Sequence, residues 1–349
     1  MKLKFSHPYK ENLEINLGQF TQITGQNQQL KYYIWQLLKW YFDGKRYSAE
    51  DLSLYHQVEP DILSEGVVLN RDYFKILSVS TVEDLVREMA YKKGTVSFEF
   101  MKQHLRSVDI TKDLDDINDK LITITSKINE RLDLTCYQVK YGVESQDFTA
   151  EQLLSKSFKP CFYLGSQQIA FEFVDNEEKL LFFLNMLEKN LKEHSERILL
   201  VLKNIDDYLD YPAFYRICQK LEALCQLYPQ FYIINFPSSE GYLYVNRDNI
   251  EYINIVSDYV EHFYEFDFLY QRITQQYPTN QTPSEEELMI SLQKIGSYLF
   301  SHDIDHISLS IKEMVILKVL NRLYQYDQLS DYLVAQPNLL ELKFLQDKS

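Results

Sequence analysis

The sequence predicts an α/β protein. Its head domain should hold a mainly parallel sheet, interrupted by a helical insertion and followed by a helical C-terminal extension. Three observations predict this class. Short apolar runs alternate with amphipathic helical patterns, as in βαβ units. One long stretch between them has helical spacing only. Glycine is scarce, at nine residues beside 27 Tyr and 21 Phe, which favours long helices over glycine-rich catalytic loops.

The first 80 residues are expected to form short strands around one buried helix. The helix should run from about Gln28 to Phe42, and it is apolar on nearly every side, so it should be buried. The strands are predicted at Lys2–Phe5, Leu13–Leu17, Phe20–Thr24, Val67–Leu69 and Phe74–Val79.

Residues 81–159 are predicted to form an elongated, charge-rich helical domain inserted into the head. The stretch "TVEDLVREMA" begins with Thr81 as a capping residue and has acidic residues in its first turn. Helical spacing then continues through "FEFMKQHLRS" and "INDKLITITSKINERLDL".

After Pro160 the strand pattern returns, so residues 1–80 and 160–275 together are predicted to make the head. Apolar strands are expected at "QIAFEFV", "RILLVL", "QFYIINF" and "NIEYINIV", with helices at "NEEKLLFFLNMLEKNLKEH" and "YPAFYRICQKLEALCQLY". The polar segment 275–287 carries two prolines and is typical of a linker. Amphipathic helices follow it, so residues 276–349 are predicted to be a helical extension.

The composition and the cysteine pattern predict a cytoplasmic protein. Hydrophobic residues make up 45% of the chain, enough for a packed core, and no apolar run approaches the length needed to cross a bilayer. The four cysteines show no CxxC pairing, which is typical of reduced thiols. The net charge is −15, but residues 1–160 carry 21 Lys and Arg against 23 Asp and Glu, a net of −2. A near-neutral half can still present a basic face to DNA.

The stretch "ITGQNQQLKYY" lies between a predicted strand and a predicted helix, where a phosphate-binding P-loop would lie. Laid on the pattern GxxxxGK[ST], Gly25 takes the first glycine and Lys31 takes the lysine. Leu30 stands where the last glycine should be, and Tyr32 where a Ser or Thr hydroxyl would hold Mg²⁺. We therefore interpret this segment as a degenerate P-loop.

The strand that should carry the acidic metal partner indicates the same loss. In "RILLVLKNIDDYLD", Lys203 and Asn204 stand where an Asp-Glu pair would be, and Asp206 and Asp207 are expected to cap the next helix. GxSxG and HExxH motifs are absent. The sequence predicts no catalytic residue, and the protein is expected not to be an enzyme.

Two stretches raise the question of a metal. His302 and His306 are spaced to face one way on a helix, but a helix-start loop capped by aspartates is the alternative we prefer. The run "DITKDLDDINDK" lacks the central glycine and terminal glutamate of a calcium loop, so it is interpreted as a solvated helix face. The residues themselves predict no metal site.

Six basic residues are candidates for DNA contact. Ordinary surface charge is the alternative for each, and Lys92 and Lys93 also suit a helix C-terminus, where cations offset the dipole. The candidates are Lys45, Arg46, Lys92, Lys93, Lys102 and Arg106.

These features together resemble one family. A short strand pair precedes the degenerate loop "QFTQITGQNQQLKYYIWQLL", a helical protrusion follows, and the sheet returns with "RILLVLKNIDD" and "QFYIINFPSS". Residues 1 to about 270 resemble Csn2, the spacer-acquisition protein of type II-A CRISPR systems. The last 75 or so residues resemble the extra helical segment of its larger variant.

The resemblance implies a homotetrameric ring that encloses double-stranded DNA, prefers DNA ends and has no catalysis of its own. It implies action in antiviral defence beside the Cas1–Cas2 integrase and the Cas9 effector, and calcium bound where arm meets head in short members. A ring blind to sequence needs only Lys and Arg contacts to phosphates. Two alternatives stay open: a P-loop NTPase of DNA repair or segregation, and a protein-interaction scaffold of the adaptation complex.

Overall fold

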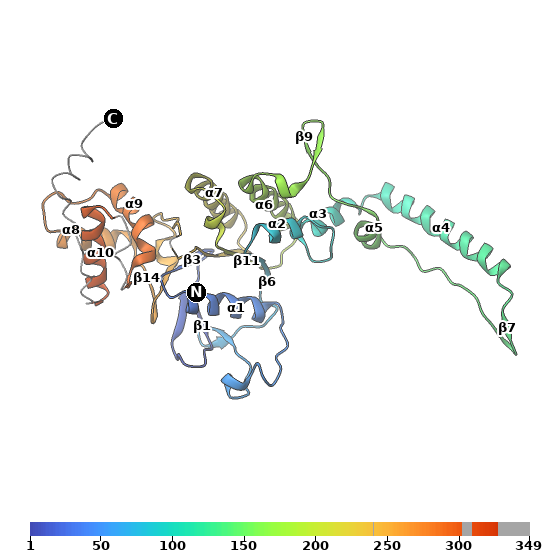
Figure 1. Cartoon of the computed structure of the whole chain (residues 1–349), viewed down its shortest axis with the longest axis horizontal. Coiled ribbons are helices and arrows are strands. Elements are labelled where there is room, and N and C mark those ends of the chain that lie inside the picture. The colour runs from blue at the N-terminus through green and yellow to red at the C-terminus, as the bar shows by residue number, and fades with distance from the viewer. Residues whose placement is uncertain (240, 302–308, 327–349) are drawn as a thin grey trace, which may run out of the picture. The chain divides into compact units, whose positions relative to one another are not determined.

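The computed structural model describes residues 1–239, 241–301 and 309–326, which form a mixed α/β chain with ten α-helices (Figure 1). A central six-stranded sheet has the order β14-β13-β3-β12-β11-β6, and a four-stranded antiparallel sheet has the order β2-β1-β4-β5. Strand β3 pairs in parallel with both β12 and β13, so the central sheet is mainly parallel, as predicted. The contacts divide the chain into two compact units, which are described in turn.

Unit 1 comprises residues 1–76, 199–207 and the described residues from 232 on. Its strands are β1 Lys2–Phe5, β2 Leu13–Asn16, β3 Phe20–Thr24, β4 Ile62–Ser64, β5 Val67–Val68, β6 Lys75–Val79, β11 Ile198–Lys203, β12 Phe231–Phe236, β13 Ile253–Val256 and β14 Val260–His262. Three of these strands, β6, β11 and β12, cross the unit boundary. Its helices are α1 Gln28–Phe42, α8 Phe266–Gln276, α9 Glu285–Ile295 and α10 Ile311–Leu323.

Helix α1 buries seven of its 15 residues, because it contributes to one core with two sheets. Ile34 and Leu38 are fully buried in a cluster that also contains Leu3 of the four-stranded sheet and Ile234 of the central sheet. The predicted bounds of this helix are confirmed. A second core joins β13 to α8, α9 and α10, and the predicted break between α8 and α9 is confirmed.

Unit 2 comprises residues 77–198 and 208–231. Its helices are α2 Val82–Glu88, α3 Val96–His104, α4 Val108–Arg131, α5 Ala150–Ser157, α6 Asn176–Glu193 and α7 Tyr211–Leu227. Two hairpins pair β7 Thr135–Cys136 with β8 Val139–Lys140 and β9 Phe162–Leu164 with β10 Gln167–Ile169. Helix α2 begins as predicted, with Thr81 and Asp84 forming a capping box.

Helix α4 has 24 residues, none of them buried, and reaches away from the other helices of the unit (Figure 1). Two asparagines tie the returning chain to it. Asn118 exchanges two hydrogen bonds with the backbone of Phe148, and Asn129 does the same with Val143. The asparagines are about three turns apart and therefore share one side of the helix. The helical character predicted for this stretch is confirmed; the predicted domain boundaries stay a prediction.

Two predicted strands are only partly right. The stretch "NIEYINIV" forms β13 only from Ile253 on, because Ile250–Tyr252 form a 3₁₀ turn. The stretch "QIAFEFV" forms β10 only to Ile169, and Phe171–Phe173 form a 3₁₀ turn. A continuous strand would place Phe171 and Phe173 on one face. Instead Phe171 is buried against Phe162, with ring centroids 4.4 Å apart, while Phe173 is 91% exposed. The prediction also missed β4.

Candidate functional site

The segment between β3 and α1 turns sharply at Gly25, as a P-loop would. Gly25 has a φ of +112°, and a Cβ built there would lie 2.3 Å from the carbonyl oxygen of Val256 in the neighbouring strand. The backbone of β13 approaches so closely that only glycine fits here. The packing of this strand explains the glycine without a bound phosphate. Two residues later, Asn27 caps α1, because its side-chain oxygen accepts a hydrogen bond from Leu30 N.

The backbone N–H groups of this loop donate to the protein itself. Asn27 N donates to Val256 O at 3.3 Å, and Gln28 N donates to Gln26 O at 2.9 Å. Leu30 N donates to the Asn27 side chain at 3.0 Å, and Lys31 N donates to Asn27 O at the same distance. A working P-loop turns its amides toward phosphate oxygens. Here four amides already have acceptors within the chain.

The side chain of Lys31 is also engaged. It is 4% exposed, and its Nζ donates to the carbonyl oxygen of Pro237 at 2.8 Å. Burial lowers the pKa of Lys31 to about 8; the negative charge of Asp206 opposes this shift and the positive charge of Lys203 adds to it. In a P-loop this lysine reaches the terminal phosphates. Here it ties the start of α1 to the chain that follows β12.

Lys203 approaches the aromatic side chains of α1. Its Nζ lies 4.7 Å from the ring centroid of Tyr32 and 4.4 Å from that of Trp35, which is the geometry of a cation–π contact. Tyr32 stands where a magnesium-binding hydroxyl is expected, and Lys203 where the acidic partner is expected. The two residues that depart from the P-loop pattern therefore contact each other, the ammonium of Lys203 lying against the ring of Tyr32.

The interaction energy between Tyr32 and Lys203 can be measured by a double-mutant cycle. Tyr32→Leu combined with Lys203→Met is expected to reveal a coupling of about 0.5–1 kcal/mol in the free energy of unfolding, because each substitution removes the same contact. Urea denaturation of the wild type, both single variants and the double variant gives the value. Lys4→Met on β1 replaces Lys203→Met in the control cycle, which should show no coupling. Additivity of Tyr32→Leu and Lys203→Met would contradict the pairing.

Asp206 does not cap the next helix as predicted. Asp210 caps α7 instead, and the Asp206 carboxylate accepts hydrogen bonds from Ser238 N at 3.1 Å and Ser238 Oγ at 2.6 Å. Burial raises the pKa of Asp206, and the hydrogen bonds from Ser238 oppose that shift. The prediction failed because Asp206 lies within the 3₁₀ turn Ile205–Asp207, and α7 begins only at Tyr211.

The two basic residues predicted after α1 belong to unit 1. The Nζ of Lys45 lies 3.6 Å from the ring centroid of Trp40 and 3.3 Å from a carboxylate oxygen of Asp51. Its positive charge is therefore partly neutralised within the unit. Arg46 is exposed.

The four basic residues predicted on the insertion belong to unit 2, and three of them gather around one acid. Lys102 Nζ lies 2.5 Å from a carboxylate oxygen of Glu151. The pKa of Glu151 is lowered chiefly by that contact, with smaller effects of Lys93 and Arg106. Lys92 and Lys93 are both exposed. One carboxylate thus faces three cations, which leaves a local positive excess.

Metal ligands do not assemble in the part of the chain that the structure describes. Within it, no three His, Cys, Asp or Glu side chains are placed to share an ion, so no residues are assigned to the calcium that the resemblance implies. The aspartates of the predicted solvated face lie on α4, whose residues are not buried. His302 and His306 lie outside the described residues.

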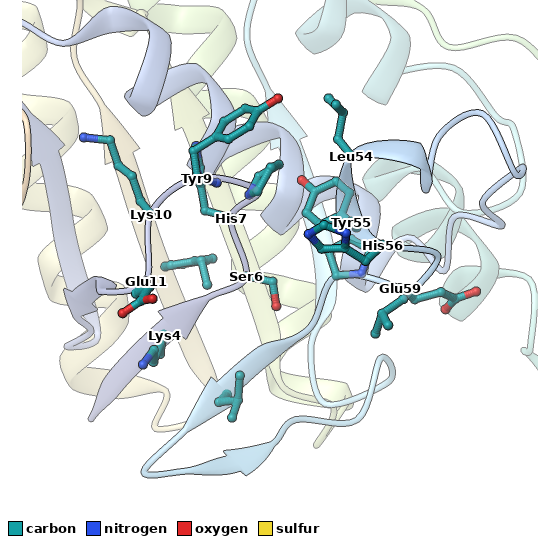
Figure 2. Close-up of a pocket in the computed structure, with 15 residues that line it drawn as sticks. Lys4, Ser6, His7, Tyr9, Lys10, Glu11, Leu54, Tyr55, His56 and Glu59 are labelled. Atoms are coloured by element: carbon teal, nitrogen blue, oxygen red, sulfur yellow. The ribbon is translucent and has the colours of Figure 1, made fainter.

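Unit 1 also contains a groove that the sequence did not single out (Figure 2). It has a volume of about 510 Å³ between residues 4–11 and residues 54–60. Two lysines, Lys4 and Lys10, and two glutamates, Glu11 and Glu59, line it, and the Nζ of Lys10 donates to Asp258 O. These charges nearly balance, so the groove has no marked preference for an anion. Its two walls are about 50 residues apart in the sequence, and no local pattern could have joined them.

No described helix has both the length and the hydropathy required to span a membrane.

Comparison with known proteins identifies the family. Residues 5–345 match the family described as CRISPR-associated protein Csn2, subfamily St. Among solved structures, the crystal structure of Stu0660 of Streptococcus thermophilus is similar, with 39% sequence identity and a TM-score of 0.91. That match covers 99% of this chain and all of the other. No curated protein matches. The resemblance stated from the sequence is confirmed, and the chain belongs to the CRISPR-associated Csn2 family.

Proposed function

We propose that this chain is a non-catalytic, double-stranded DNA-binding protein that acts in CRISPR adaptation. It assembles as a homotetrameric ring, binds the ends of DNA during the capture of new spacers, and works in the cytoplasm beside the Cas1–Cas2 integrase and the Cas9 effector. Its head is a P-loop NTPase-like scaffold that has lost its nucleotide site. Membership of the Csn2 family supports the adaptation role.

One observation carries the non-catalytic part of the proposal. The groups that a nucleotide would need at the β3–α1 loop are bonded within the chain: Lys31 Nζ to Pro237 O, and the loop amides to backbone and side-chain oxygens. Binding a triphosphate would require breaking these bonds before any new one formed. The contact of Lys203 with Tyr32 also puts a positive charge where Mg²⁺ would have to enter.

DNA binding of this kind should depend steeply on salt. The affinity for a linear duplex, measured by fluorescence anisotropy, is expected to fall as salt rises, because each neutralised phosphate releases counterions. Lys93→Ala and Arg106→Ala should each make the log–log slope shallower by about one for every phosphate contact removed. Lys312→Ala, at a residue paired with Glu287 in unit 1, is the control and should leave the slope unchanged.

Three results would favour other functions. An affinity for the duplex that does not change with salt concentration would contradict the DNA-binding proposal. ATP turnover that disappears in Lys31→Ala would favour an NTPase. Charge reversal at Lys92, Lys93, Lys102 and Arg106 that leaves spacer acquisition intact would favour a scaffold. Light scattering of the protein with and without a linear duplex tests the ring of four.

A further inference from the structure

Unit 2 contains a second groove, of about 580 Å³, that differs in character from the one in Figure 2. Its walls are the end of α2 with the residues that follow it, the end of α5, and the β9–β10 hairpin. Four aromatic residues line it, together with two lysines and one glutamate. These residues are Tyr91, Phe158, Phe162, Phe171, Lys92, Lys159 and Glu172.

The aromatic rings of the groove are not equivalent. Phe171 is buried against Phe162, with centroids 4.4 Å apart, and both rings also approach Phe182, so this cluster supports the hairpin from within. Phe158 is different, because it directly follows α5 and is 45% exposed. Tyr91 is half-buried, and burial raises its pKa, so its phenol stays neutral. The groove therefore offers Phe158 as an accessible flat apolar surface, with Tyr91 partly accessible beside it.

The charge around the groove favours an anion. Residues 86–106 and 151–172 hold seven Lys and Arg against four Glu, a net of +3, although the whole chain carries −15. Lys92 and Lys159 line the groove directly, with Glu172 as the one acid among its lining residues. The neighbour of Lys92 in the chain, Lys93, belongs to the cluster around Glu151. Cations thus continue from the groove to the residues already proposed to contact phosphates.

An aromatic face beside a row of cations is the chemistry that receives a nucleotide. The base stacks on the ring, whatever its identity, and the phosphates lie along the lysines. A base inside a duplex cannot reach such a groove, because it is already stacked on both sides. The terminal pair of a duplex is stacked on one side only, so its bases open at the smallest cost. A volume of about 580 Å³ lies in the range of small-molecule sites.

We propose that this groove holds the terminal nucleotide of a DNA strand, with its base on Phe158 and its phosphates on Lys92 and Lys159. The inference rests on the proposed function and deepens it, because it assigns the preference for DNA ends to named residues. Phosphate contacts elsewhere on the protein bind any part of a duplex equally. The groove adds a contact that only an end can make.

Photocrosslinking tests this assignment with the full chain. Two blunt 30-base-pair duplexes carry 5-iododeoxyuridine, which crosslinks to aromatic side chains, either at a strand terminus or in the middle. After irradiation, mass spectrometry locates the attachment. The terminal label is expected to attach at Tyr91, Phe158 or Phe162, and the central label at none of them. Phe158→Ala should lower the terminal yield at least about fivefold, the smallest effect expected for the loss of one stacked base.

Matched variants separate the groove from general effects. Phe173→Ala removes an aromatic residue that is 91% exposed and does not line the groove, and it should leave the yield unchanged. Lys159→Ala removes a lining cation and should lower the yield, whereas Lys156→Ala, three residues earlier on α5, should not. Phe158→Trp keeps a stacking surface and should retain the crosslink. This last variant also shows that the loss in Phe158→Ala does not come from misfolding.

The outcomes distinguish this inference from the proposed function. A duplex that binds with full affinity, but whose terminal label attaches outside the groove or is unaffected by Phe158→Ala and Lys159→Ala, would overturn the groove assignment alone. A protein that binds no duplex at low salt would overturn the proposed function and the groove assignment together.

Discussion

Gly25→Ala is expected to lower the free energy of unfolding by about 4 kcal/mol, because the substitution combines backbone strain with steric overlap. A φ of +112° is a conformation that residues with a Cβ rarely adopt. The new methyl group would also lie 2.3 Å from Val256 O and 2.6 Å from Val256 N. These are backbone atoms of β13, and they cannot rotate aside as a flexible side chain would. Urea denaturation at pH 7 measures the loss.

Gly44→Ala is the control that separates the two causes. Gly44 also has a positive φ, of +67°, but a Cβ there would meet no atom within 4 Å. Its replacement should cost only about 1 kcal/mol, for strain alone. If Gly25→Ala lowers the free energy of unfolding no more than Gly44→Ala does, the backbone of β13 does not crowd a Cβ at position 25. The glycine would then have room for a ligand, and the explanation of Gly25 by strand packing would be wrong.

The segment around Gly25 shows which features of a site a local sequence pattern can predict. The pattern correctly marked a sharp turn between a strand and a helix, because alternating apolar spacing and a lone glycine are local signals. It also placed Lys31 at the spacing of a P-loop lysine. The acceptor of that lysine, Pro237 O, lies 206 residues further along the chain. No local pattern specifies a bond over that separation, so the sequence could show where this segment departs from the P-loop pattern but not which contacts its residues make.

The same limit applies to Tyr32 and Lys203. The sequence marked each as a separate departure from a nucleotide site, and only the pairing of strands and helices in space brings them within 4.7 Å. The groove of unit 2 is a stronger case. Of its lining residues the sequence singled out Lys92 alone, because the others come from the ends of two helices and a hairpin. The aromatic residues there resemble ordinary core positions until their exposure is known.

The charge state of Lys31 supplies the second large effect, a dependence of stability on alkaline pH. The ordinary pKa of a lysine is 10.5, and burial lowers that of Lys31 to about 8 in the folded chain. Between these values the folded state has released the proton while the unfolded state still holds it. The unfolded state therefore binds more protons, and the free energy of unfolding contributed by this residue rises with pH. Below pH 8 both states are protonated and the contribution is constant.

Lys31→Met isolates this contribution, because it keeps a long side chain and removes the titrating group. The free energy of unfolding of the wild type, minus that of Lys31→Met, is expected to rise by about 2 kcal/mol between pH 7.5 and pH 9.5. Tyrosines whose pKa values are raised by burial, such as Tyr33 and Tyr41, titrate alike in both proteins and cancel in the difference. A flat difference would mean that the ammonium of Lys31 is solvated. An open, solvated lysine at this position is what a nucleotide requires, so that result would count directly against a closed, non-catalytic loop.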